Sequence, residues 1–576
     1  MAPPTHAHEL TRAQKVVTMT GVLLALLLAA LDQTIVATAG PAMQADLHID
    51  AAHYPWLATS YMVASTVMLP IYGKLSDIFG RKPILVIGIL IFVTGSVLCG
   101  LSRTSLQVIL ARVVQGLGSA SLFTSAFTVV ADLFPPAVRG KYQGLIGGVF
   151  ALSSVVGPLL GGFLTDAFSW HWVFFINLPI GVVALVFILL KMPSLRQSMG
   201  GTRPRIDLVG AFVLVLAVVP LLVALSLGRG GSAPAGAGGY PWGSAPILGL
   251  FALSLVGFVL FVLIERRVGH PLLDLGLFRN RIFAVGNATV CILGAGFLSA
   301  VVFLPLFMVN VVGLSATRSG LTLTPLTLGV VAGNVMAGQL VSRIGRYRML
   351  MLGALVVLTV GYAIMGFTLT PESTQTEVTV KMVLVGLGMG PTLPLYTLAI
   401  QNAVPPAQVG VATSAVTFFR QMGSTIGVAL MGTVFAATLA SSMIGGTTAR
   451  LPPEVRERLP APGTGGSGGE EMGAGQAFPA KQLEADLRED FAARQREVEA
   501  RLEGSARAEA LSQLQAEEAR AVAAVGEVEQ TLKEGFTEAI SAIYRIAILI
   551  SVLGFLLTLF LPEQPLRRTN APAPSE

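Results

Sequence analysis

The sequence contains few charged residues for its length. Asp, Glu, Lys and Arg make up only 12% of its 576 residues, and hydrophobic residues make up 53%. An ordinary soluble domain is about 25% charged, so this composition excludes a soluble protein and indicates a polytopic membrane protein. The net charge of +6 comes mostly from loops between apolar segments, and it gives no reason to expect nucleic-acid binding.

Cysteine and the usual catalytic patterns are also scarce. Cys99 and Cys291 both lie in apolar runs, which argues against a disulfide framework or a metal site. The sequence has no phosphate-binding loop of the Walker type, so ATP is not expected to drive the protein. Because no nucleophile is paired with a base, we expect no enzymatic activity. We expect neither a cofactor nor a metal ion.

Long apolar segments dominate the sequence instead. A membrane-spanning helix needs about 20 mostly apolar residues, and by this criterion we count about fourteen spans. They begin near Val17, Trp56, Pro83, Leu106, Leu145, Trp172, Leu208, Pro246, Ile282, Gly320, Met349, Val378, Val409 and Ala539. An even number of spans places both termini on the same side of the membrane.

The distribution of Lys and Arg predicts which side that is. Basic residues gather in the loops that follow spans two, four, six, eight and ten. Short cytoplasmic loops are enriched in basic residues, so we expect both termini in the cytoplasm and the protein in the plasma (inner) membrane. The run from Thr11 to Gly40 could also pass for a signal peptide, but Asp32 within it and the many later spans argue against cleavage.

The chain contains an internal repeat. "GKLSDIFGRKPILVIGIL" from Gly73 aligns without gaps with "GQLVSRIGRYRMLMLGAL" from Gly338, and "FPPAVRG" after span four matches "VPPAQVG" after span twelve. Spans two, four and five thus correspond to spans ten, twelve and thirteen. Parallel repeats of this kind build transporters whose substrate cavity lies between the two halves, near the middle of the membrane.

The repeat predicts an all-α membrane protein of two six-span bundles joined by two linking spans. The predicted segments are the N-terminal bundle (1–200), the two linking spans (201–268), spans nine to thirteen of the C-terminal bundle (269–440), an extracytoplasmic insert (441–537), and the last span with a cytoplasmic tail (538–576).

Six motifs follow one another along the chain. They are "LDQTIVATAGP" from Leu31, "GKLSDIFGRK" from Gly73, "ARVVQGLGSA" from Ala111, "GPLLGG" from Gly157, "FFRQMGSTIGVALMG" from Phe418 and "LPEQPLR" from Leu561. In this order they resemble the major facilitator superfamily, specifically its fourteen-span drug:proton antiporter branch (the EmrB/QacA type).

This resemblance implies a monomeric transporter that uses protons as the coupling ion. Its substrates would be lipophilic, cationic small molecules, exported by rocking of the two halves about a central cavity in the lipid bilayer. One alternative is export of a lipid or glycolipid, and another is a membrane scaffold or sensor without flux.

The motif after span two carries the residues of a candidate gate. Its glycines permit a tight turn and close helix approach, and its charged side chains can form an ion-pair cluster on the cytoplasmic face that holds one conformation. The residues are Gly73, Lys74, Asp77, Gly80, Arg81 and Lys82. The alternative is that these cations only set the topology.

Span five contains glycine and proline where a regular helix is expected. Gly157, Pro158, Gly161 and Gly162 form the motif that the family resemblance ties to antiport. Small residues let helices approach closely, and a proline removes a backbone donor and bends the helix. The alternative is simply a well-packed span.

Asp32, Arg112 and Arg420 are the charged residues expected at membrane depth. A charge there costs on the order of 2.5–3.5 kcal/mol on insertion scales, so it normally faces the protein interior and has a function. We expect Asp32 to carry the proton. The family motif implies a part in proton transfer for Arg112. Arg420, at the repeat position of Phe150, is expected to pair with Asp32 or with a substrate anion, unless it snorkels to an interface. Asp166, at the end of span five, is expected to be an exposed loop carboxylate.

Polar and aromatic residues within apolar spans are candidates for the wall of a wet cavity. They are Tyr61, Gln115, Asn287, Asn310, Asn334 and Phe419. The amides could equally form hydrogen bonds between helices, and the aromatic side chains could belong to the membrane interface.

The insert departs from the family pattern. A Gly/Pro linker ending near Pro479 precedes two helical stripes of apolar residues. The stripes are Leu483, Leu487, Phe491, Val498 and Leu502, then Leu511, Leu514, Val522 and Val525. They predict an external helical hairpin whose second arm could continue into the last span. Such an extension could dock a periplasmic partner or shield a lipid path.

Overall fold

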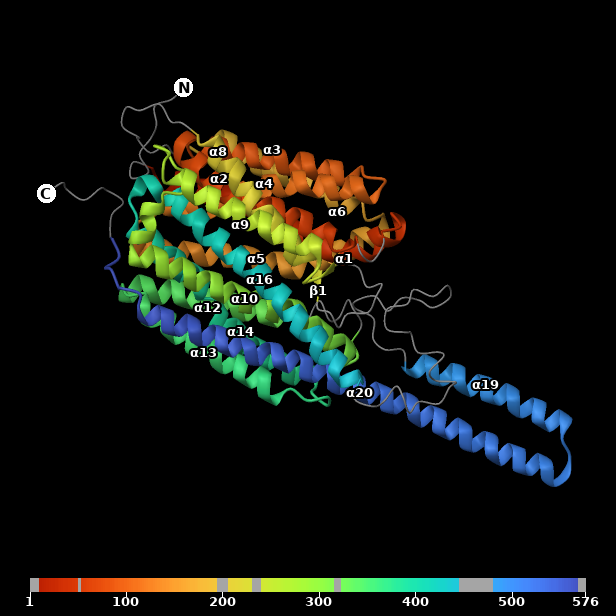
Figure 1. Ribbon diagram of the computed structural model, residues 1–576. Helices are drawn as coiled ribbons and strands as arrows, with labels where there is room; N and C mark the ends of the chain where they lie inside the picture. The colour runs from red at the N-terminus through yellow and green to blue at the C-terminus, as the bar shows by residue number, and fades with distance from the viewer. Residues whose placement is uncertain are drawn as a thin grey trace.

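The computed structural model describes residues 10–49, 53–193, 206–229, 240–314, 323–444 and 480–567, which are almost entirely helical (Figure 1). The α-helices are α1 (Arg12–Asp46), α2 (Trp56–Phe79), α3 (Arg81–Gly100), α4 (Ser105–Leu133), α5 (Pro136–Ala167), α6 (Trp172–Phe175), α7 (Asn177–Lys191), α8 (Leu208–Leu227), α9 (Ala245–Glu265), α10 (Arg281–Asn310), α12 (Leu323–Ile344), α13 (Arg348–Thr368), α14 (Gln375–Met389), α15 (Thr392–Ala403), α16 (Val409–Ile444), α19 (Ala480–Arg501) and α20 (Gly504–Leu559). Two short 3-10 helices, η2 (Leu275–Arg279) and η3 (Pro406–Gln408), precede α10 and α16. The strands β1 (Gly228–Arg229) and β2 (Tyr240–Pro241) pair in parallel. The all-helical, polytopic architecture predicted from the sequence is confirmed.

Local sequence explains where several helices begin and end. Thr11 caps α1, because its hydroxyl accepts from the Gln14 amide while the Gln14 side chain accepts from the Thr11 amide at 2.9 Å. Such a capping box satisfies backbone donors that the first helical turn leaves free. The turn from α2 to α3 passes through Gly80 (φ 92°), and the turn from α12 to α13 passes through Gly345 (φ 73°). These two glycines are repeat partners, and both adopt the left-handed backbone that glycine tolerates best.

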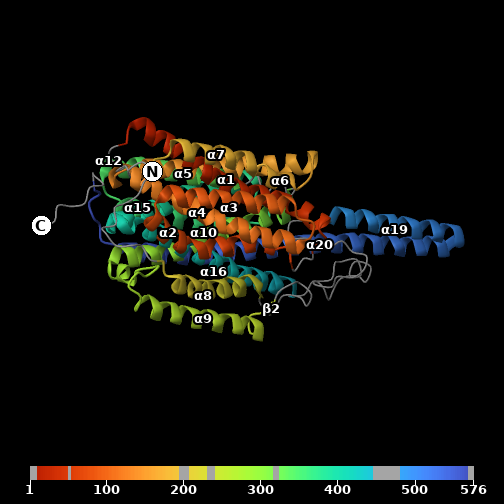
Figure 2. The same ribbon diagram turned by 90° about the horizontal axis from the view of Figure 1, so that it is seen from above.

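The helices form two groups that pack along a shared boundary. In Figure 1, α1–α7 make up one group, and the other contains α10, α12–α16 and the last part of α20. The groups meet where Gly73 of α2 lies against Ser414 of α16, and where Gly140 of α5 lies against Gly338 of α12. Helices α8 and α9 pair with each other at the edge of the bundle (Figure 2).

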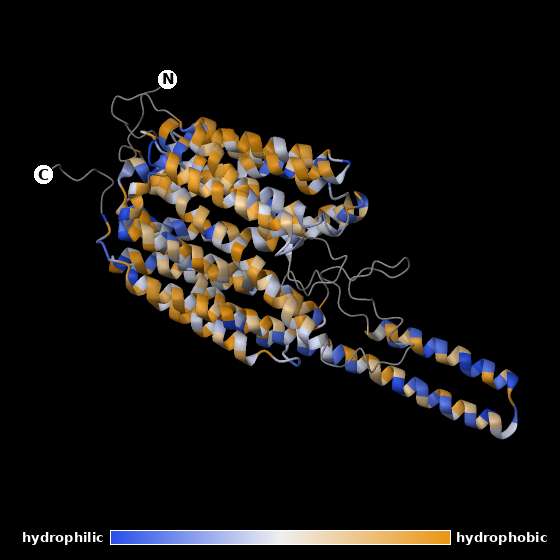
Figure 3. Ribbon diagram, viewed as in Figure 1, coloured by the Kyte–Doolittle hydropathy of each residue, from blue (hydrophilic) through white to orange (hydrophobic). Residues whose placement is uncertain are grey.

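The surface of the bundle is apolar, as a lipid environment requires. Figure 3 shows hydrophobic residues over most of the bundle, and hydrophilic residues alternating with hydrophobic ones along the hairpin that projects from it. Leu208 and Phe212 of α8 and Leu255 of α9 are examples of large exposed apolar side chains. In a membrane these side chains would contact lipid.

Thirteen of the helical segments in the described ranges are long and apolar enough to cross a membrane. The predicted second span, α2, is a helix of 24 residues but is not among the thirteen. Buried polar residues within it, such as Ser60, Ser65 and Thr66, lower its hydropathy. The count of fourteen spans stays a prediction.

The predicted helical hairpin is present. Helix α19 packs against the first part of α20, and α20 then continues without a break, over 56 residues in all, into the bundle (Figure 1). Leu483, Leu487 and Phe491 are buried against α20, and Val525 is buried from the other side. The stripe residues nearer the turn are less buried, and Leu502 is exposed. Helix α16 extends to Ile444, so the linker begins later than predicted, and 445–479 lie outside the described residues.

The hairpin leaves the bundle at one end, here called the hairpin end. The other end, where α2 ends and α3 begins, carries the Lys- and Arg-rich loops and is here called the basic end. Figure 1 shows these two ends on opposite sides of the bundle.

We expect Leu487→Ala to loosen the hairpin, since truncating a buried leucine costs about 2–5 kcal/mol. Limited trypsin digestion of the purified protein should cleave α19 faster in this variant than in the parent. Gln482→Ala, at an exposed position of the same helix, is the matched control and should be cleaved at the parent rate. Equal rates for both variants would contradict the packing described.

Candidate functional site

The two predicted charges Asp32 and Arg112 form a buried ion pair between α1 and α4. Arg112 Nη1 donates to Asp32 Oδ2 at 2.6 Å, and the side chain of Asp32 is fully inaccessible. Arg112 also donates from Nε to the carbonyl of Leu57, in the first turn of α2, at 3.0 Å. The ring of Tyr61 lies 4.3 Å from the guanidinium carbon, within the range of a cation–π contact. The pair is therefore held by three helices of the N-terminal half.

Two amides complete the shell of the carboxylate. Gln115 Nε2 donates to Asp32 Oδ1 at 2.7 Å, and Asn177 Nδ2 donates to the same oxygen at 2.9 Å. Asn177 begins α7 and also donates to Ser96 Oγ on α3. The sequence analysis missed Asn177, because a single amide at the start of a span carries no distinctive pattern. The site thus draws on α1, α2, α3, α4 and α7.

The negative charge of Asp32 stabilises the buried positive charge of Arg112. A buried ion pair repays its desolvation only while both charges are present, and removing one charge leaves the other uncompensated. A proton on Asp32 would remove the negative charge that Arg112 contacts. Arg112 would then need another partner or another position, which is how protonation can drive a change of conformation.

Arg420 lies elsewhere. The expectation that it pairs with Asp32 is wrong for this conformation, because Asp32 is occupied by Arg112, Gln115 and Asn177. Arg420 is on α16 in the C-terminal half, and no hydrogen bond or ion pair joins its side chain to a described residue. Its Nε atom is buried.

The candidate gate is a second buried charge network, at the basic end. Arg81 Nη1 contacts Asp77 Oδ1 at 2.6 Å, and Arg81 Nε contacts Asp132 Oδ2, on α4, at 2.7 Å. Asp77 also accepts from the backbone amides of Gly410 (3.1 Å) and Val411 (2.9 Å), in the first turn of α16. Because α16 belongs to the other half, Asp77 ties the two halves together.

Not every predicted gate residue joins this network. Gly73 permits the close contact with Ser414, and Gly80 makes the turn. Lys82, however, donates to the carbonyls of Leu189 and Met192 at the end of α7, so its predicted ion pair with the cluster is wrong. Lys74 has no ion pair with Asp77 among the described contacts. The cluster has a second acid instead, because Asp132, which the sequence does not single out, pairs with Arg81.

The glycine motif of α5 packs against α1, next to Asp32. A Cβ at Gly157 would collide with Thr34, and one at Gly161 would collide with Thr38, whereas Gly162 has no neighbour within 4 Å. Thr34 also donates to the carbonyl of Ser153 at 2.9 Å. Pro158 lies inside the continuous helix α5. Two of the three glycines therefore set the contact between the two helices.

The predicted cavity residues do not gather in one place. Tyr61 and Gln115 belong to the Asp32 site. Asn287 and Asn310 each donate to a carbonyl in their own helix, Asn334 contacts Gly147 of α5, and Phe419 lies 6.1 Å from Phe278. A cavity of about 560 Å³ lies at the start of α1 and contains none of them. Its lining includes Leu10, Arg12, Lys15, Met19, Phe134 and Tyr142.

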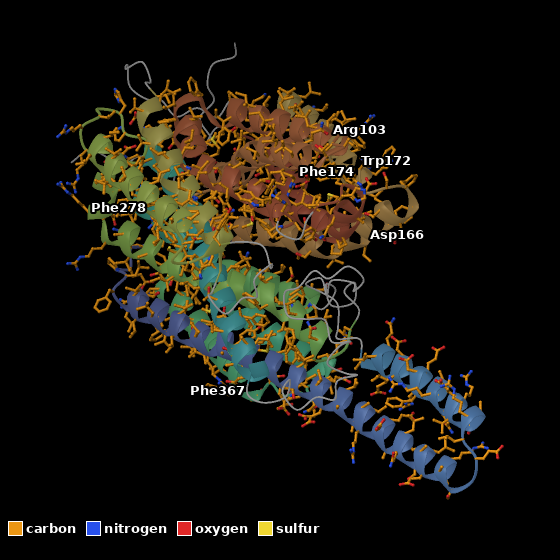
Figure 4. The ribbon with its side chains drawn as sticks, turned by 45° about the vertical axis from the view of Figure 1, so that its right-hand side comes forward. Arg103, Asp166, Trp172, Phe174, Phe278 and Phe367 are labelled. Carbon is orange, nitrogen blue, oxygen red and sulfur yellow. The ribbon has the colours of Figure 1, made fainter. Side chains whose placement is uncertain are left out.

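Asp166 is exposed, as predicted. Figure 4 places it near Trp172, and no described contact joins it to Asp32 or Arg112. It therefore takes no part in the Asp32 site.

Comparison with known proteins settles the family. The family model described as "Major Facilitator Superfamily" matches residues 22–428. The chain belongs to the major facilitator superfamily. It is 40% identical over 414 residues to "Multidrug resistance protein 3" of Bacillus subtilis (72% of this chain, 78% of the relative). It is 37% identical over 426 residues to "Multidrug transporter protein MdtP" of the same species (74% and 76%).

A solved structure shows the same fold. The human organic anion transporter MFSD10 superposes with a TM-score of 0.54 at 15% identity, over 73% of this chain and 94% of that one. The hairpin of this superfamily member lies beyond residue 428, where the family match ends. The fourteen-span branch stays a prediction.

For this superfamily member we expect Gly161→Ala to disturb the packing of α5 on α1, because the added Cβ meets Thr38 and the backbone of Ile35. Overpacking of this kind typically costs about 1–3 kcal/mol. Thermal unfolding of the purified protein should show a lower midpoint. Gly162→Ala, with open space at its Cβ, is the control, and an equal shift in both variants would disprove the contact.

We expect Asp77→Asn to weaken the closure of the basic end, since breaking a buried charge pair costs about 3–5 kcal/mol. Spin labels at exposed Lys141 (α5) and Ile344 (α12), in a background without Cys99 and Cys291, should report longer distances between the halves. Lys82→Gln alters the same loop but no contact across the halves. If Lys82→Gln lengthens the distance between the labels as much as Asp77→Asn does, Asp77 is not the residue that holds the two halves together.

Proposed function

We propose that this chain exports lipophilic small molecules across the plasma membrane in exchange for protons, by alternating access. The observation that carries the proposal is the fully buried Asp32, paired with Arg112 and held by two amides. The similarity to multidrug transporters of 37–40% identity supports drug efflux. A carboxylate buried among charged and polar partners is the kind of group that transporters use to carry a proton through the membrane.

In the proposed cycle, the basic end faces the cytoplasm, in keeping with its Lys- and Arg-rich loops. The network of Asp77 with Arg81, Gly410 and Val411 would then close the cytoplasmic side. The state described is thus assigned as closed to the cytoplasm, and the hairpin as external. Both termini are placed in the cytoplasm.

Helix α2 offers a direct connection between the proton site and the closure. Arg112 contacts the carbonyl of Leu57 in its first turn, and Asp77 lies in its last turns. When Asp32 is protonated, Arg112 loses its charged partner and its hold on Leu57 can change. A rigid helix would carry this change to Asp77 and release α16, which opens the basic end.

The ion pair of Asp32 with Arg112 also affects which charge the substrate can carry. Asp32 can attract a cationic compound only after it is released from Arg112, so the predicted cationic preference requires the two to separate. If exchange moves net charge, the membrane potential adds about 2.3 kcal/mol per charge per 100 mV to the proton gradient.

Proteoliposomes test the proposal. With an imposed proton gradient, the parent protein should move a lipophilic dye uphill and move protons in the opposite direction. Asp32→Asn should abolish both, because its amide cannot carry a proton at this position, whereas Asp166→Asn, at the exposed carboxylate, should leave both unchanged. Uphill export by Asp32→Asn under a proton gradient would refute the assignment.

Export of a lipid or glycolipid is the second candidate, favoured by the long hairpin α19–α20. A fluorescent phospholipid in place of the dye tests it in the same vesicles. Proton-dependent movement of the phospholipid without movement of the dye would favour this alternative.

A further inference from the structure

Arg420 is a membrane-depth cation with no partner among the described residues. It is the twelfth residue of α16, about 17 Å along the helix from its first residue. Its Nε atom is buried without a hydrogen bond. Arg112, by contrast, uses Nε and Nη1 on Leu57, Asp32 and Gln115. Arg420 as a whole is only partly buried, so its guanidinium is accessible, and a partly desolvated cation gains from contact with an anionic group.

The acids of its own half make other contacts. Glu538 of α20 pairs with Arg545, and Glu563 accepts from the backbone amide of Arg348. Between residues 281 and 453 the only carboxylates are Glu372 and Glu377, next to the connection of α13 and α14. Glu377 already pairs with Lys381. Asp32 of the other half is occupied by Arg112. Among the described residues, no acid pairs with Arg420, so an anionic ligand can take that place.

Arg420 lies on a helix at the boundary between the two halves. Helix α16 packs against α10 of its own half, where Gly294 meets the backbone of Arg420, and against α2 of the other half at Ser414. It therefore lies at the boundary between the halves, where transporters of this architecture bind substrate.

The residue before Arg420 belongs to an aromatic cluster. Phe419 lies 5.4 Å from Phe418 and 6.1 Å from Phe278, which in turn lies 5.0 Å from Phe283. An amphiphilic ligand that reached both the guanidinium and this cluster would make one charged and one apolar contact. The repeat partner Phe150 stacks instead on Phe123 at 5.9 Å, so the charge is present in one half only.

We infer that Arg420 binds the anionic group of an amphiphilic organic compound, with the apolar part of the compound against the Phe418–Phe419–Phe278 cluster. A guanidinium presents a planar fork of donors that matches a carboxylate, sulfonate or phosphate. The inference deepens the proposed function and rests on it, since it adds organic anions to the exported compounds.

Three dansyl probes with one undecyl chain and a terminal carboxylate, methyl amide or amine test the inference. Their dissociation constants for the full-length, detergent-purified protein are measured by fluorescence. The parent protein should bind the carboxylate more tightly than the amide. Arg420→Gln should weaken carboxylate binding about tenfold or more, which corresponds to about 1.4 kcal/mol, and leave the amide unchanged. Arg420→Lys should retain part of the preference.

Arg343→Gln is the matched control, because it removes the same charge at an exposed position of α12 and should leave all three dissociation constants unchanged. An equal loss for the three probes in Arg420→Gln, or a parent protein that does not distinguish carboxylate from amide, overturns the inference. If Arg420→Gln fails to fold, the comparison of the carboxylate and amide probes in the parent protein still tests the inference.

The outcomes separate this inference from the proposed function. Proton-driven dye export by the parent without carboxylate selectivity leaves the function intact and overturns the inference. Carboxylate selectivity that depends on Arg420, in a protein whose Asp32→Asn variant still exports uphill, supports the anion site and overturns the assigned proton carrier.

Discussion

The buried pair of Asp32 and Arg112 is the interaction on which the other features of the N-terminal half depend. Two charges removed from water are stable only together and with their remaining hydrogen-bonding groups satisfied. Helices α2, α4 and α7 supply those partners, and the glycines of α5 bring Thr34 and Thr38 of α1 into contact beside the pair. The packing of this half therefore serves to keep a carboxylate and a guanidinium together in a place from which water is excluded.

The second charge network differs from the first in what it joins. Asp32 is satisfied within one half, whereas Asp77 accepts from backbone amides of the other half. The first few amides of a helix have no partner within the helix, so a carboxylate there is well placed to fasten α16. Helix α2 connects both networks, with Leu57 near one end and Asp77 near the other.

The sequence predicted the parts of the site that depend on membrane depth and periodicity. A carboxylate or guanidinium in an apolar run is conspicuous, which is why Asp32 and Arg112 were found. The hairpin followed from stripes spaced as a helix requires. Asn177 and Asp132 were missed, because an amide at a span's start and an acid at a helix end are ordinary in sequence. Which arginine pairs with Asp32 depends on helix adjacency, which no motif encodes.

The two halves share a scaffold but differ in charge, and this difference has a physical consequence. Gly157 packs on α1 as its repeat partner Gly427 packs on α10, so both halves bring the same pair of helices into close contact. The N-terminal half encloses a neutral ion pair, while in the C-terminal half Arg420 pairs with no described acid. Rocking the halves brings these unequal surfaces to the same cavity.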